Sequence, residues 1–213
     1  MLGLALFWVG AVLCLNGLWL LGRIGDNEIA VIDVFVGGLT LAVSVYLAFG
    51  PGADQASIAA AAFTLLFSFT YFWVAWNRYN GADGRGLGWF CLFVAITTVP
   101  IFLDTFANAT TTWDVWFGIS WASWGVLWFL FFLILALNRT QLTMVTGVIC
   151  TAQGIYTGWI PGYLLLTGNM PGVAPPAPVV EEETTTGSLT LPLLEPTLLA
   201  DLGSSLLGFA GLG

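Results

Sequence analysis

A run of aromatic residues between positions 113 and 137 is the part of this sequence best placed to act on a small molecule. Five rings follow helical spacings of four, four, three and four residues and so share one face: Trp113, Phe117, Trp121, Trp124 and Trp128. Trp rings near helix ends are typical of a membrane-interface belt, which is the interpretation favoured for Trp113 and Trp116. The three deeper Trp residues lie too far from the helix ends for that role. They predict the wall of a narrow slot.

Two further segments offer faces that could complete such a slot. Residues 2–22 carry a stripe with helical spacing that ends in an amide: Leu2, Leu6, Val9, Leu13 and Asn16. Within residues 56–77, Phe67 and Tyr71 are one helical turn apart. Three such faces around one axis would be walled by flat rings and branched aliphatic side chains. Asn16, Gln153 and the Tyr71 hydroxyl could offer intermittent hydrogen bonds.

The chemistry of such walls favours small neutral polar molecules over ions. Stripping an ion of water costs tens of kcal/mol in an apolar medium, whereas a neutral amide loses roughly a few kcal/mol. A planar amide can lie between indole faces, with its N–H edges directed at the rings. The slot therefore predicts a passage for neutral amides.

The composition of the sequence gives little support to catalysis, metal binding or nucleic-acid binding. The sequence has no His, and its three Cys residues, Cys14, Cys91 and Cys150, are scattered. Four basic residues against twelve carboxylates give a net charge of -8, which disfavours a nucleic-acid partner. We therefore expect no enzyme, no metal site and no cofactor.

The elements that must position these faces are membrane helices. Hydrophobic residues make up 58% of the 213 residues and charged residues only 8%, which excludes an ordinary soluble domain and a disordered chain. Since about 20 apolar residues span a bilayer, six segments qualify: about 2–22, 29–50, 56–77, 87–106, 113–137 and 142–167. The first lacks a basic region and a cleavage site and is interpreted as a mature helix. Residues 1–167 are predicted to form one all-α, six-helix channel domain.

The basic residues predict the orientation of these helices. Arg23, Arg78, Arg85 and Arg139 all fall in the loops after the first, third and fifth helices. The positive-inside rule makes that side cytoplasmic, so both termini are expected to be extracytoplasmic.

An internal period suggests three helical hairpins around one axis. Asn16, Asn77 and Asn138 are each about 61 residues apart, and so are Pro100 and Pro161. Chance recurrence of polar residues near membrane boundaries is the alternative.

The last part of the chain differs in composition. Residues 168–188 are rich in Pro, Glu and Thr and predict an extended linker. Residues 189–213 are Leu-rich and interrupted by Pro and acidic residues, which favours an amphipathic segment at the outer interface or on a neighbouring subunit. A mobile tail with no role is the alternative.

Ten short blocks in chain order carry a resemblance to a known family. They are Met1-Leu2-Gly3-Leu4, Val9-Gly10, Asn16-Gly17, Phe35-Val36-Gly37-Gly38-Leu39, Phe69-Thr70-Tyr71, Leu92-Phe93-Val94-Ala95-Ile96, Thr98-Val99-Pro100, Trp124-Gly125-Val126-Leu127-Trp128, Gly154-Ile155 and Trp159-Ile160-Pro161. Together they cover the first 167 residues or so. On these blocks the chain resembles the bacterial urea/amide channel (AmiS/UreI) family, which includes acid-activated urea channels.

The resemblance implies a six-helix protomer with its own pore, assembled as a homohexamer in the inner membrane. It implies pore positions at Leu2, Leu6, Val9, Leu13, Asn16, Phe67, Tyr71, Trp121, Trp124, Leu127 and Trp128. Gln153 replaces a pore-facing glutamate of the acid-activated members, and their long His-bearing outer loops are absent here. These departures argue against proton gating, and the acidic, Leu-rich tail has no counterpart in the family pattern.

The sequence thus predicts a passive channel for urea, acetamide and other short-chain amides, in contact with membrane lipids. A cytoplasmic amidase or urease is the expected consumer of the substrate. The pore-lining set adds Phe117 and Gln153 to the positions that the resemblance implies. A proton-coupled amide carrier and a membrane scaffold that transports nothing are the alternatives.

Overall fold

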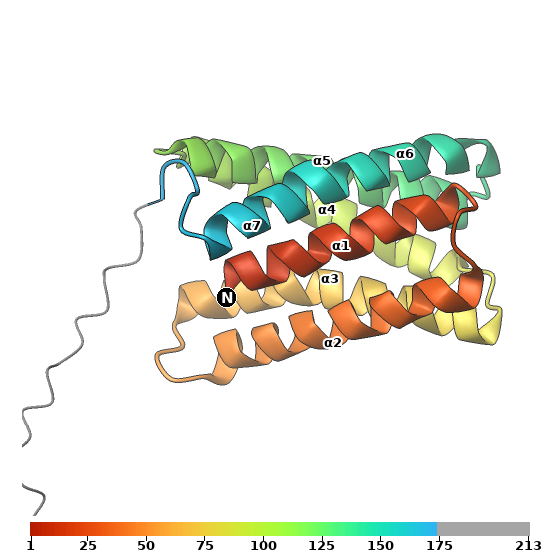
Figure 1. The fold of residues 1–213 in the computed structure, drawn as a ribbon, viewed down its shortest axis with the longest axis horizontal. Coiled ribbons are helices and arrows are strands. Elements are labelled where there is room, and N and C mark those ends of the chain that lie inside the picture. The colour runs from red at the N-terminus through yellow and green to blue at the C-terminus, as the bar shows by residue number, and fades with distance from the viewer. Residues whose placement is uncertain (174–213) are drawn as a thin grey trace, which may run out of the picture. The chain divides into compact units, whose positions relative to one another are not determined.

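The computed structural model describes residues 1–173, which contain helices and turns and no strand (Figure 1). The chain order is α1 (Leu2–Leu20), α2 (Asp26–Phe49), α3 (Gln55–Asn80), α4 (Arg85–Ala107), α5 (Thr112–Leu135), a short 3₁₀ turn η1 (Thr140–Leu142), α6 (Thr143–Gln153), a π-helical turn η2 (Gly154–Trp159) and α7 (Ile160–Leu166). The six predicted spans are confirmed, with their bounds shifted by a few residues. The linker beyond residue 173 and the segment 189–213 lie outside the described residues.

The sixth span consists of three consecutive pieces. Helices α1 to α5 are each long and apolar enough to cross a membrane. The last span runs through α6, η2 and α7 without a break, and its middle is wound as a π-helix. The Thr157 hydroxyl donates to the Gln153 carbonyl within this turn, at 2.6 Å. Single π turns inside α-helices are frequent at functional sites.

Local sequence explains where α3 and α5 begin. Asp54 and Ser57 form a capping box at the start of α3, and Thr111 and Asp114 form a second one at the start of α5. Each box satisfies backbone N–H groups that the first turn of a helix leaves unpaired.

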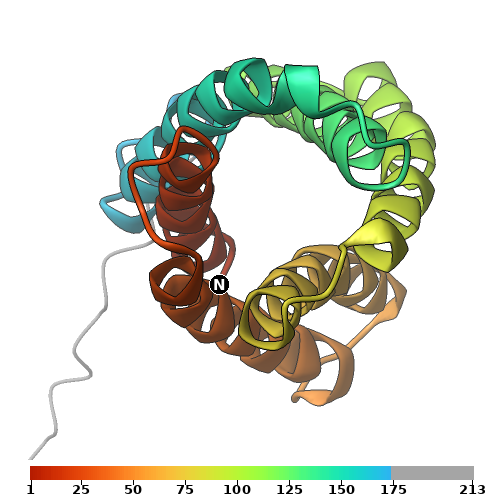
Figure 2. The same cartoon turned by 90° about the vertical axis from the view of Figure 1, so that its right-hand side faces the viewer.

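The six spans form a ring around a central axis (Figure 2). The most extensive packing joins α2 to α3, α4 to α5, and α1 to the sixth span. The seams between α1 and α2, α3 and α4, and α5 and α6 are looser. The three-hairpin ring is confirmed. The 61-residue period relates the hairpins α1–α2, α3–α4 and α5 with the sixth span, whereas the most extensive packing lies between successive hairpins. Pairing of the first span with the sixth closes the ring.

Glycines explain the close contact between α1 and the sixth span. A Cβ atom on Gly154 would lie 2.6 Å from the backbone nitrogen of Cys14, and a Cβ on Gly10 or Gly158 would collide with the facing backbone. Small residues permit such backbone approach between membrane helices, where the hydrophobic effect does not drive association. This seam is therefore the rigid side of the ring.

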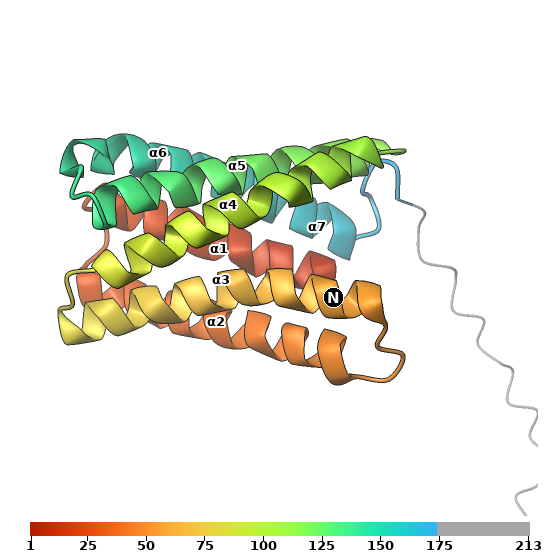
Figure 3. The same ribbon diagram turned by 180° about the vertical axis from the view of Figure 1, so that it is seen from behind.

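All four arginines lie at one end of the ring, in the connections between helices or in the helix turns next to them. The α1–α2, α3–α4 and α5–α6 connections share that end, which we call the arginine end (Figures 1 and 3). The start of α1 and the α2–α3 and α4–α5 connections share the opposite end, which we call the amino-terminal end. Large apolar side chains such as Val31, Trp89 and Phe93 face outward and are more than half exposed. The outer surface therefore suits contact with lipid.

Candidate functional site

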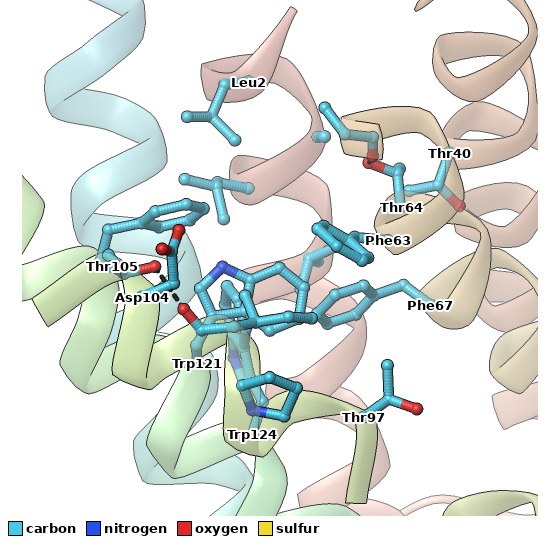
Figure 4. Close-up of a pocket in the computed structure, with 17 residues that line it drawn as sticks. Leu2, Thr40, Phe63, Thr64, Phe67, Thr97, Asp104, Thr105, Trp121 and Trp124 are labelled. Atoms are coloured by element: carbon cyan, nitrogen blue, oxygen red, sulfur yellow. Dashed lines mark hydrogen bonds between the residues drawn. The ribbon is translucent and has the colours of Figure 1, made fainter. Parts of the chain in front are cut away.

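A wide cavity of about 450 Å³ opens the ring at the amino-terminal end (Figure 4). Helices α1, α3, α4 and α5 supply most of its wall, with one residue from α2. Its lining residues are Leu2, Ala5, Leu6, Val9, Thr40, Ala60, Phe63, Thr64, Phe67, Thr97, Pro100, Ile101, Asp104, Thr105, Phe117, Trp121 and Trp124. The lining is predominantly apolar, with threonines spread over three of the helices.

A middle cavity of about 40 Å³ lies next to the wide one and shares Phe67 and Trp124 with it. Its lining residues are Leu13, Asn16, Phe67, Thr70, Tyr71, Val74, Trp124, Leu127, Trp128, Phe131 and Cys150. None of them is charged, within the part of the chain that the structure describes. This volume is about a tenth of that of the wide cavity.

A third cavity, of about 30 Å³, lies toward the arginine end and shares Val74 and Phe131 with the middle one. It is also lined by Trp19, Asn77 and Arg78. Neighbouring cavities thus share lining residues and follow one another along the axis of the ring. They describe a path that is wide at one end and narrow through the middle and the arginine end.

Four aromatic rings, which we call the collar, separate the wide cavity from the middle one: Phe67, Trp121, Trp124 and Trp128. The Phe67 ring is central, with its centroid 4.8 Å from Trp128, 4.9 Å from Trp124 and 5.8 Å from Trp121. Trp121 and Trp124 are 5.1 Å apart and nearly perpendicular. Edge-to-face packing of this kind stabilises aromatic clusters, so the collar is a firm constriction.

Hydrogen bonds hold the indole rings of α5 in place. The Trp124 Nε1 donates to the Thr157 hydroxyl at 2.8 Å, and Trp116 Nε1 donates to the Tyr156 carbonyl at 2.8 Å. Both acceptors belong to the π turn. Trp128 Nε1 donates to the Thr70 hydroxyl at 3.3 Å. The N–H groups of these rings are thus occupied by the protein, and the ring faces remain for a passing solute.

The threonines of the wide cavity offer hydrogen-bond acceptors. The hydroxyls of Thr64, Thr97 and Thr105, which are only partly buried, each donate to a carbonyl of their own helix, at 2.7 to 2.8 Å. A hydroxyl has one proton to donate and two lone pairs. Because the proton is used within the helix, the remaining lone pairs can accept from a solute N–H. The wall is therefore better suited to an N–H donor than to a carbonyl.

Two polar groups of the middle cavity are left without a partner among the described residues. They are the Asn16 carbonyl oxygen Oδ1 and the Tyr71 hydroxyl, and both side chains are at least nine-tenths buried. Buried polar atoms in folded proteins are nearly always hydrogen-bonded. Both atoms belong to side chains that line the middle cavity, and the described residues leave them unpaired there.

Exposed carboxylates lie at both ends of the ring. At the amino-terminal end, the Ser57 backbone N–H donates to Asp54 at 2.7 Å and holds the pKa of that carboxyl below its usual range. At the arginine end, the Arg85 backbone and guanidinium donate to Asp83 and lower the pKa of that carboxyl as well. Both groups stay ionised at ordinary pH.

The structure brings together all but one of the residues predicted to line a pore. Leu2, Leu6, Val9, Phe117 and Trp121 line the wide cavity; Leu13, Asn16, Tyr71, Leu127 and Trp128 line the middle one; Phe67 and Trp124 line both. Gln153 lines neither, because its Nε2 donates to the Ser123 carbonyl at 2.9 Å within the contact between α5 and the sixth span.

The sequence reasoning missed the contribution of α4 to the wide cavity. Thr97, Ile101 and Asp104 follow a helical spacing of four and three residues, with Pro100 and Thr105 beside them. That spacing was visible in the sequence. It was missed because only the odd-numbered helices carried aromatic stripes.

The comparisons with known proteins agree with this architecture. Residues 1–169 match the family described as AmiS/UreI family transporter. A protein of Mycolicibacterium smegmatis that carries the name of an amidate substrates transporter is 42% identical over 178 residues, which is 84% of this chain and 82% of that protein. The acid-activated urea channel of Helicobacter pylori strain J99 is 37% identical over 190 residues, with 78% of this chain and 97% of that protein covered.

Solved structures of a relative have the same fold. The cryoEM structure of the H. pylori urea channel in its closed state matches with a TM-score of 0.70 at 37% identity, covering 78% of this chain and 98% of that one. The crystal structure of the urea channel from H. pylori matches with a TM-score of 0.68 at 36% identity, covering 78% and 97%. The all-α, multi-pass membrane fold is thereby confirmed. The chain belongs to the AmiS/UreI family of transporters.

Proposed function

We propose that this protein is a passive channel for urea, acetamide and other short-chain aliphatic amides. The observation that carries the proposal is the line of three cavities along the ring axis, narrowed by the aromatic collar. Ring faces suit a planar amide, and the free threonine lone pairs suit its N–H groups. The names of the relatives, an amidate substrates transporter and a urea channel, point to the same substrate class.

The lining argues against ions as the transported species. A cation needs rings of carboxylates or carbonyls to replace its water, and the middle cavity has no charged side chain among the described residues. A neutral amide loses far less hydration free energy than an ion in the same space. The channel is therefore expected to exclude Na⁺ and K⁺.

A proton-coupled carrier is the second candidate, and Asp33 is the observation that favours it. This carboxylate is completely buried in α2, and ionisable residues inside membrane proteins often belong to proton relays. Asp33 nevertheless lines none of the three cavities and is bonded to Asn16. Passive passage fits this placement better.

The orientation, assembly and metabolic setting belong to the same proposal. The arginine end faces the cytoplasm of a bacterial inner membrane, because all four basic residues lie there. The protomer assembles as a homohexamer, as the family resemblance implies. A cytoplasmic amidase or urease consumes the substrate. Native mass spectrometry of the purified protein tests the assembly. Labelling of the loops at the arginine end with a membrane-impermeant reagent, applied from one side of the membrane at a time, tests the orientation.

Stopped-flow light scattering on proteoliposomes tests the transport proposal. Vesicles that contain the protein should re-swell faster in urea or acetamide than protein-free vesicles, and adding an uncoupler should change nothing. Flux that rises under an imposed proton gradient and loses that rise when an uncoupler is added would favour the carrier. Permeability equal to that of protein-free vesicles would overturn both proposals and favour a scaffold.

A further inference from the structure

Asp33 of α2 and Asn16 of α1 form a buried pair beside the middle cavity. The Asn16 amide nitrogen Nδ2 donates to the Asp33 carboxylate oxygen Oδ1 at 2.9 Å. Asn16 is 5% exposed and Asp33 is fully buried. Asn16 lines the middle cavity, whereas Asp33 lies behind it and lines none of the three. The pair thus connects a wall residue of the path to a carboxylate that no solute reaches.

The pairing decides which end of the Asn16 amide is free. An asparagine side chain has an NH₂ that only donates and a carbonyl that only accepts, and an ionised carboxylate only accepts. Because the NH₂ donates to Asp33 Oδ1, the Asn16 carbonyl is the group that is left free. That atom, Oδ1, has no partner among residues 1–173.

A purely structural role does not account well for this carboxylate. Its second oxygen, Oδ2, also has no partner in the described part of the chain. A buried, half-paired carboxylate in a membrane span is costly, and such residues are usually retained for function. An asparagine at this position would fill the same space without the charge, but it would accept either orientation of Asn16.

We propose that Asp33 is a positioning residue for substrate selection, which fixes Asn16 with its carbonyl toward the path so that the channel prefers solutes by their number of N–H groups. The wide cavity, with its threonine acceptors, presents the same kind of wall before the collar. The middle cavity, which is about a tenth of the volume of the wide one, adds one oriented acceptor beyond the collar. This inference rests on the proposed passage of amides and adds the chemical rule by which they are ranked.

Three isomeric amides separate N–H recognition from size. Propionamide, N-methylacetamide and N,N-dimethylformamide share one molecular formula and carry two, one and no N–H bonds. Permeability of each is measured by stopped-flow light scattering on proteoliposomes, after subtraction of matched protein-free vesicles. For the wild-type protein we expect propionamide to be fastest and N,N-dimethylformamide slowest, with about a fivefold step for each lost hydrogen bond.

Two substitutions test the positioning role. Asp33→Asn keeps the volume but allows Asn16 to turn its NH₂ toward the path, so the ranking of the isomers should flatten by about fivefold or more. Asn16→Leu removes the acceptor and should flatten the ranking even though Asp33 is unchanged. In the Asn16→Leu background, Asp33→Asn should have no further effect on the ranking, because Asp33 acts through Asn16.

Ser44→Ala is the matched control for loss of a buried hydrogen bond in α2. The Ser44 hydroxyl donates to the Thr40 carbonyl of its own helix, at 2.8 Å, and lines none of the three cavities. This variant should keep the wild-type ranking. If either single variant does not fold, the double variant Asn16→Leu with Asp33→Asn leaves no unpaired buried carboxylate, and a ranking that survives in it overturns the role of the Asn16 acceptor.

The outcomes distinguish this inference from the function on which it rests. A wild-type protein that passes none of the three isomers, and neither urea nor acetamide, contradicts the channel proposal itself. A wild-type protein that passes all three at equal rates contradicts N–H ranking alone. A ranking that survives in Asn16→Leu, or that Asp33→Asn still changes in the Asn16→Leu background, overturns the positioning role.

Discussion

The wide cavity and the middle cavity differ in volume and in the helices that line them. The wide one has about 450 Å³ and takes several lining residues from each of α1, α3, α4 and α5. The middle one has about 40 Å³ and is enclosed chiefly by α1, α3 and α5, with the indoles of Trp124 and Trp128 held by hydrogen bonds. A tenfold smaller space with fixed walls can discriminate between solutes, whereas the wide one cannot. We therefore assign admission to the wide cavity and selection to the collar and the middle cavity.

Removal of a collar ring should reduce the selectivity between solutes more than any other substitution. Trp124→Ala joins the two cavities, and the permeability of butyramide relative to acetamide should rise by about tenfold or more, because a pocket discriminates each methylene by about 1 to 3 kcal/mol. The measurement is stopped-flow re-swelling of proteoliposomes. Trp73→Ala is the control, since Trp73 packs on Phe69 and Phe90 and lines none of the three cavities. Equal ratios in the two variants would show that the collar is not the selective element.

Trp19 is not a suitable control for this comparison. Its ring lines the cavity at the arginine end, its Nε1 donates to Asp26 at 2.6 Å, and the Arg78 guanidinium lies 5.0 Å from its ring centroid. A change at Trp19 would alter the path itself.

Loosening the collar without removing a ring should have an intermediate effect. Thr157→Val removes the acceptor of the Trp124 N–H and keeps the side-chain volume, so the same solute ratio should change by about threefold. Thr146→Val is a matched control on the same span, because the Thr146 hydroxyl is buried and has no partner among the described residues. If both variants behave alike, the π turn does not position Trp124.

A substitution in the wide cavity should have only a small effect on permeability. Thr64→Val removes one acceptor from a wall that has several, and we expect acetamide permeability to fall by less than about twofold. A loss as large as that of Thr157→Val would place selection in the wide cavity.

External pH should have the smallest effect. The hydrogen bonds of Asp54 and Asp83 lower the pKa of each carboxyl, so these groups contribute stability above the unfolded-state pKa and lose it only as the pH falls through the lower folded-state value. Both transitions lie at or below about pH 4. These two carboxylates should therefore give acetamide flux and the melting temperature no dependence on pH between about 5 and 8. Steep activation on acidification within that range would reveal a titrating group that controls the path.

The features of the fold that depend on helical periodicity could be predicted from the sequence. The six spans, the ring of three hairpins and the inward faces of α1, α3 and α5 follow from apolar segments, a 61-residue period and aromatic stripes. The pairing of Asn16 with Asp33 could not be predicted, because it depends on the rotation of two helices about their axes. Gln153 was predicted to line the pore, but the π turn after it and its bond to Ser123 place it in a helix–helix contact. A π turn has no clear sequence signal, so the facing of residues near it is hard to predict.

The most direct test of the central claim uses two positions of α3 on either side of the collar. Thr64 lines the wide cavity, and Val74 lines the two narrow ones. Thr64→Cys and Val74→Cys are made in a background with Cys14, Cys91 and Cys150 replaced by Ala, after that background is shown to retain acetamide flux. A membrane-impermeant thiol reagent is then applied to intact cells or to inverted membrane vesicles. We expect each position to react from one side only, Thr64→Cys and Val74→Cys from opposite sides, with acetamide flux blocked by the modification. Reaction of both positions from the same side, or modification without any loss of flux, would contradict a single path divided by the collar.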